Sequence, residues 1–90
     1  MVTLPAILNY GKYSSGNYGV NTLKVRVRDL LIYYSYKTII AFMHRGKFTI
    51  SKNEWGTTTG KHLNWIDEDK SKRIQHNEVI DRLNKVLKTL

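Results

Sequence analysis

The segment of residues 55–67, WGTTTGKHLNWID, combines glycine, threonine and lysine as phosphate-binding loops do. The P-loop of NTPases has four residues between its glycines, and its lysine is followed by a Ser or Thr that binds magnesium. Here three threonines separate Gly56 from Gly60, and Lys61 is followed by His62. We therefore interpret the segment as a turn that opens a short helix. Lys61, beside that helix N-terminus, remains a candidate contact to one phosphate of a nucleic-acid backbone.

The remaining titratable and nucleophilic residues form no catalytic or metal-binding pattern. Residues 67–70, DEDK, have the carboxylate-x-lysine form of metal-dependent nucleases, but they lie in a polar linker rather than on a core strand. The three histidines, His44, His62 and His76, lack the close spacing that metal sites favour. The chain has no cysteine, which excludes disulfides and thiol catalysis. We expect a protein that is not an enzyme and that uses no metal and no cofactor.

A set of cations and tyrosines in the middle of the chain is a stronger candidate for function. Three cations of residues 22–28 alternate with apolar residues, and another cation opens the segment of residues 47–51. On the polar side of a sheet, cations interleaved with aromatic rings neutralise phosphates and stack bases. The alternative is a solvated face whose Lys and Arg prevent edge pairing. The predicted nucleic-acid-binding residues are Lys24, Arg26, Arg28, Lys47, Tyr33, Tyr34 and Lys61, with Thr49 beside Lys47.

The charge of the chain supports a polyanionic partner. The formal net charge is +8, from 15 Lys and Arg against 7 Asp and Glu. Residues 1–37 contribute +4, and residues 38–60 and 61–90 contribute +2 each. Such a field steers a protein towards nucleic acid or an acidic partner. The charge does not separate DNA from RNA, and solubility alone is an alternative explanation for it.

The elements that position these residues are predicted from hydrophobic periodicity. Residues 22–28 alternate with a period of two, which indicates a half-buried strand. Residues 30–36 and 38–44 are rich in β-branched and aromatic residues, and residues 47–51 alternate again. The pairs at 28–29 and 45–46 predict tight turns. We expect a four-stranded antiparallel meander over residues 22–51, with Phe48 and Ile50 inward and Lys47 and Thr49 outward.

Helices follow the predicted meander. Residues 57–66 predict a short helix with a threonine cap, and residues 77–90 predict a C-terminal amphipathic helix capped by Asn77. Its apolar stripe comprises Val79, Ile80, Leu83, Val86, Leu87 and Leu90. The expected fold is therefore one α+β domain over residues 1–90, with the C-terminal helix packed on one face of the sheet.

The N-terminal segment, residues 1–21, is predicted to be a loop rich in Gly, Ser, Asn and Tyr. We expect it to be ordered, because its tyrosines are costly to leave in solvent. It lacks the cationic start of a signal peptide, and the chain has no apolar run of membrane-spanning length. We expect a soluble protein of the cytoplasm.

Two segments resemble a family of small uncharacterised domains from phages, archaeal viruses and related mobile elements. The first is YGKYSSGNYGVNTL at residues 10–23, and the second is ISKNEWGTTTGKHLNWID at residues 50–67. Between them lies a YYSYKTIIAF-type strand pair, so that the resemblance spans most of residues 10–83. The matching residues are Tyr13, Ser14, Ser15, Asn17, Tyr18 and Gly19, then Trp55, Thr58, Thr59, Gly60, Lys61, His62, Leu63 and Asn64. Gly56 and Thr57 depart from the pattern without changing its spacing. The resemblance implies a viral or mobile-element setting and one compact domain, without an activity.

Two functions therefore remain open. The first is an accessory protein that binds nucleic acid through the basic and aromatic sheet face. The second is a protein-binding module, such as an inhibitor of a host defence or regulatory complex, anchored by Tyr13 and Tyr18. A homodimer formed through exposed tyrosines and an edge strand is a further alternative.

Overall fold

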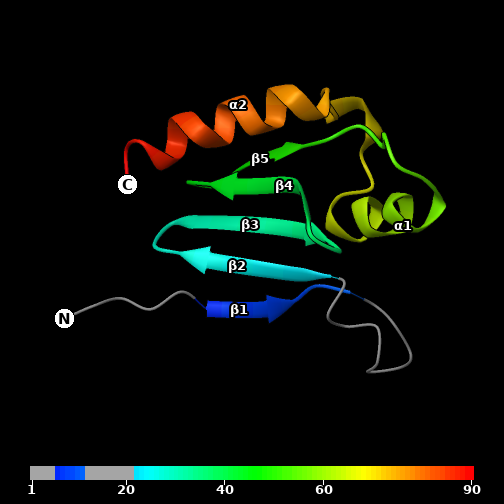
Figure 1. Cartoon of the computed structure of the whole chain (residues 1–90), viewed down its shortest axis with the longest axis horizontal. Helices are drawn as coiled ribbons and strands as arrows, with labels where there is room; N and C mark the ends of the chain where they lie inside the picture. Colours follow the sequence, from blue (N-terminus) through cyan, green and yellow to red (C-terminus); the bar gives the residue numbers. More distant parts are fainter. Residues whose placement is uncertain (1–5, 12–21) are drawn as a thin grey trace.

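The structure is a computed structural model that describes residues 6–11 and 22–90 of the chain. An antiparallel sheet of five strands has the order β1-β2-β3-β4-β5, so that every strand pairs with its neighbour in sequence (Figure 1). Two α-helices and one turn of 3₁₀ helix follow the sheet. This architecture confirms the predicted α+β meander. The bounds are β1 (Ala6–Asn9), β2 (Leu23–Val27), β3 (Leu30–Ser35), β4 (Thr38–His44), β5 (Lys47–Ile50), α1 (Thr57–Ile66), η2 (Lys70–Lys72) and α2 (His76–Leu87).

Strand β1 corrects the prediction that residues 1–21 form only a loop. Its four residues pair with β2, and the backbone N–H of Tyr10 extends the pairing by donating to the carbonyl of Thr22 at 3.0 Å. Ile7 is 68% exposed and Leu8 44% exposed. Since neither side chain enters a core, the segment lacks the alternation of polar and apolar residues by which a half-buried strand is found.

Two-residue turns connect β2 to β3, β3 to β4 and β4 to β5, closed by the pairs Val27–Leu30, Ser35–Thr38 and His44–Lys47. The first turn residue has a positive φ in each case: 57° at Arg28, 56° at Tyr36 and 52° at Arg45. Hairpin turns of this length favour such angles because they match the twist of the strands. None of the three is Gly, Asn or Asp, so each carries backbone strain.

The two faces of the sheet bury separate clusters. On one, which we call the α1 face, Tyr33, Ile40, Ala41 and Ile50 pack with Leu63 of α1. On the other, the α2 face, Leu30 and Phe42 pack with Val79 and Leu83 of α2. An irregularity in the β3–β4 register pairs Tyr33 with Ala41 but Tyr34 with Ile39. Ile40 is thus an extra residue, and it joins Ala41 in the α1-face core.

The helices differ from the prediction mainly at their ends. Helix α1 has the predicted bounds, but its N-cap is Gly56 rather than a threonine, and no side chain caps it. Helix α2 ends at Leu87, with Gln75 rather than Asn77 at the N-cap. It packs on β4 and β5 and runs along that side of the sheet, whereas α1 lies at the end of the sheet near the β3–β4 turn (Figure 1).

Candidate nucleic-acid interface

Three of the predicted binding residues share the α1 face of the sheet. Lys24 pairs directly with Tyr33, and Arg26 lies two residues further along β2 on the same side. The Lys24 Nζ atom is 5.9 Å from the centroid of the Tyr33 ring, a cation–π arrangement. Tyr33 is only 6% exposed, and burial raises the pKa of its phenol. The structure therefore brings these three residues together, with Tyr33 as a buried support for Lys24.

Lys47 and Thr49 lie on the α2 face, contrary to the prediction that they share a face with Lys24 and Arg26. Of the alternatives Tyr33 and Tyr34, the register places Tyr33 beside Lys24 and Tyr34 on the α2 face. Lys47 pairs with His44, which pairs with Leu30, which pairs with Val27, so all four side chains share one face. Alternation along one strand shows which residues share a side, but it does not match that side to the next strand. Because both faces carry a core, apolar residues on β5 do not mark the same face as apolar residues on β2.

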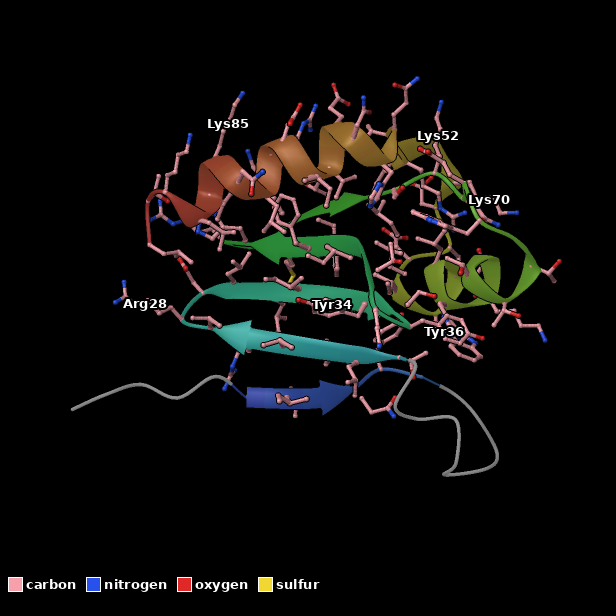
Figure 2. The ribbon with its side chains drawn as sticks, in the orientation of Figure 1. Arg28, Tyr34, Tyr36, Lys52, Lys70 and Lys85 are labelled. Carbon is pink, nitrogen blue, oxygen red and sulfur yellow. The ribbon has the colours of Figure 1, made fainter. Side chains whose placement is uncertain are left out.

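The remaining predicted residues are dispersed. Arg28 lies in the β2–β3 turn and extends beyond the end of the sheet opposite α1 (Figure 2). Lys61 is exposed on α1, on the side of the helix away from buried His62 and Leu63. Tyr13 and Tyr18 lie outside the described residues.

The register adds apolar and aromatic residues that the sequence did not assign to the surface. Arg26 pairs with Leu31, Leu31 with Met43, and Met43 with Phe48, in one row across the α1 face. Phe48 is 40% exposed, and its ring centroid is 5.9 Å from that of Tyr33. The shared parity of Phe48 and Ile50 was visible in the sequence, but their placement beside Arg26 requires the strand pairing. We call this surface the basic platform: Lys24, Arg26, Leu31, Tyr33, Met43 and Phe48.

The electrostatics of the sheet differ from those of the whole chain. Residues 22–52 contain seven Lys and Arg but a single carboxylate, Asp29. Asp29 lies 3.2 Å from Arg45 Nε and 3.4 Å from His44 Nε2, and the hydrogen bond from Arg45 lowers the pKa of its carboxyl. In the part of the chain that the structure describes, no carboxylate pairs with Lys24, Arg26 or Arg28. These cations are therefore available to an anionic partner.

A hydroxyl–imidazole contact links the sheet to α1. The Ser35 Oγ atom lies 2.7 Å from His62 Nδ1 and 3.1 Å from Thr59 Oγ1. Such a pair resembles a nucleophile and its base, but Ser35 is 2% exposed and His62 is fully buried. Burial lowers the pKa of His62, which favours the neutral imidazole. The contact is thus buried and links α1 to β3.

Residues 6–11 and 22–90 contain neither a metal-binding cluster nor a membrane-spanning helix. No group of three or more His, Asp or Glu side chains is arranged to hold a metal ion there. None of the helices in that part of the chain has the length and apolarity needed to span a membrane.

Comparison with known proteins identifies the chain by family. No curated protein and no solved structure matches it. A family model, described as a family of unknown function (DUF8033), matches residues 6–82, which include all five strands, α1 and most of α2. The chain therefore belongs to the family of unknown function DUF8033.

Proposed function

We propose that this protein binds nucleic acid without catalysis, as an accessory protein of a virus or mobile element. The observation that carries the proposal is the basic platform, where two cations that pair with no carboxylate of the described residues share a sheet face with an exposed phenylalanine ring. The sequence resemblance supports the viral or mobile-element setting.

The platform supplies the two contacts that single-stranded nucleic acid needs. Cations track the phosphates, and an aromatic ring stacks a base whatever its identity. Arg26 lies on β2 and Phe48 on β5, three strand spacings apart, or about 14 Å at roughly 4.8 Å per spacing. Leu31 and Met43 fill the row between them, so a chain crossing the sheet meets a continuous surface.

Arg28 extends the cationic surface past the end of β2. Its φ of 57° is an angle at which a non-glycine residue is strained by about 1–2 kcal/mol. Arg45, at the same end of the sheet, also has a positive φ, but its guanidinium pairs with Asp29. Arg28 has no carboxylate partner in the described chain, so its exposed guanidinium can donate charge-assisted hydrogen bonds to a phosphate.

Fluorescence anisotropy with labelled single-stranded and duplex oligonucleotides, repeated over a range of salt concentrations, tests the proposal. If Lys24, Arg26 and Arg28 neutralise three phosphates, the log–log slope of affinity against salt is about −2 on a single strand. A stacking platform also predicts tighter binding to the single strand than to the duplex. A flat salt response on both substrates would reject the proposal.

A protein partner is the second candidate, and strand β1 favours it. Ile7 and Leu8 are exposed on an edge strand that carries no charge. Exposed apolar edges are sites of strand addition by another chain, either a host protein or a second copy of this one. An Ile7→Lys/Leu8→Lys variant separates the cases: loss of a partner captured from nuclease-treated host lysate supports a host protein, and loss of a dimer mass in solution supports self-association. If neither a partner nor a dimer is found with the wild type, this candidate is rejected.

A further inference from the structure

The α2 face contains a cationic cavity that the basic platform does not use. A cavity of about 210 Å³ opens between β4, β5 and α2, lined by Phe42, His44, Lys47, Thr49, Arg82 and Val86. Phe42 pairs with Thr49 and His44 pairs with Lys47, which places all four side chains on the side of the sheet that α2 covers. Arg82 and Val86 complete the lining from one side of that helix.

We propose that this cavity binds a phosphomonoester with a small apolar substituent. Lys47 and Arg82 supply two positive charges, which match the charge of a phosphomonoester near neutral pH. Thr49 adds a hydroxyl donor to the lining, and Phe42 and Val86 add apolar side chains to it. The volume suits a ligand about the size of one ring with its phosphate.

Two carboxylates near the cavity, Glu78 and Asp29, pair with residues of its lining and compete there with a bound phosphate. Glu78 Oε2 lies 3.8 Å from Arg82 Nη2, near the limit for an ion pair, and the Arg82 side chain is 54% exposed. His44 is already paired with Asp29 at 3.4 Å. Lys47 pairs with no carboxylate among the described residues. Among the carboxylates of residues 6–11 and 22–90, a phosphate therefore competes with Glu78 for Arg82 and meets no competitor at Lys47.

Because Glu78 competes with the phosphate, loss of a cation should weaken phosphate binding and loss of the Glu78 charge should strengthen it. Titrations of the ¹⁵N-labelled protein with phenyl phosphate, inorganic phosphate and benzyl alcohol at constant ionic strength measure each affinity by NMR. We expect Lys47→Ala and Arg82→Ala each to weaken phenyl phosphate about tenfold, the effect of losing a charge-assisted hydrogen bond. Glu78→Gln is expected to tighten binding about threefold, because it releases Arg82. Phenyl phosphate is expected to bind about fivefold more tightly than inorganic phosphate, and benzyl alcohol not to bind.

Matched variants on the same helix separate a built site from general charge attraction. Asp81→Asn makes the same charge change as Glu78→Gln, and Lys85→Ala the same as Arg82→Ala; neither Asp81 nor Lys85 lines the cavity. We expect both controls to leave the affinity within about twofold of the wild type. Equal effects of each variant and its control would overturn the proposal, as would amide shifts spread over the sheet rather than around Lys47, Thr49 and Arg82. Because the platform lies on the opposite face, failure here leaves the nucleic-acid proposal standing.

Discussion

The sheet and the helical part of the molecule carry the same number of cations but very different numbers of carboxylates. Residues 22–52 hold seven Lys and Arg and one Asp, whereas residues 53–90 hold seven Lys and Arg and six Asp and Glu. In the helical part, Lys72 lies near Asp67 and Asp69, and Arg82 lies near Glu78. The net charge of the chain is therefore concentrated on the sheet. The charges of +4, +2 and +2 over residues 1–37, 38–60 and 61–90 do not show this difference, because the bounds of those segments do not follow the sheet and the helical part.

Under the proposed function, the packing of α2 on the sheet stabilises the fold, and nucleic acid binds to the exposed α1 face of the sheet. The largest effect that separates these roles is loss of a buried helix contact. Leu83 of α2 is 3% exposed against Leu30 and Phe42. We expect Leu83→Ala to lower the free energy of unfolding by about 2–5 kcal/mol, measured by urea denaturation. Nucleic-acid affinity per folded molecule should not change; if it falls with stability intact, the division of roles is wrong.

Removal of the Phe48 ring tests whether the basic platform on the sheet binds single-stranded nucleic acid. Loss of one stacked base weakens binding by about 1–3 kcal/mol, so we expect Phe48→Ala to reduce single-strand affinity at least fivefold in anisotropy titrations. Trp55→Ala is the matched control, because Trp55 is 41% exposed and lies outside the platform. Equal losses of affinity in the two variants would contradict the stacking of a base on the Phe48 ring.

The buried imidazole at the junction of sheet and helices predicts a dependence of stability on pH. Burial lowers the pKa of His62 from its ordinary 6.5. The unfolded state therefore binds a proton more readily than the folded state does, and stability falls as the pH drops below about 6.5. We expect a lower urea midpoint at pH 5 than at pH 7.5, and a smaller difference in His62→Gln. Asp29 and Asp69, whose carboxyl pKa values are lowered, lose their contribution only as the pH falls below about 4.

How far the fold follows from the sequence depends on burial. The strands over residues 22–51 and both α-helices were predictable, because each has at least one buried side and shows its period. Strand β1 was not, since Ile7 and Leu8 are exposed. The face of Lys47 was predicted wrongly. When both faces of a sheet are covered, the alternation within one strand does not show which of its sides lies on the same face as a given side of the next strand. The Ser35–His62 contact joins residues 27 positions apart, so no local spacing in the sequence predicts it.

The smallest predicted effect has opposite signs for stability and binding. Asn tolerates a positive φ better than Arg, so Arg28→Asn is expected to raise the free energy of unfolding by about 0.5–1 kcal/mol. The same change removes the phosphate contact proposed for Arg28 and should weaken nucleic-acid binding. For Arg45→Asn we expect a smaller gain, because that variant loses the Asp29 pair. A fall in stability for Arg28→Asn, measured by denaturation, would contradict the role given to backbone strain.

Two triple variants of equal charge, compared by the salt dependence of single-strand binding, show whether the binding surface lies on the sheet. Lys24→Ala/Arg26→Ala/Arg28→Ala removes three cations of the sheet, and Lys70→Ala/Lys85→Ala/Lys88→Ala removes three from the helical part, where Lys85 points away from the sheet (Figure 2). We expect the first variant to lose most of a log–log slope of about −2 and the second to keep it. Equal loss of slope in both variants would contradict a binding surface located on the sheet.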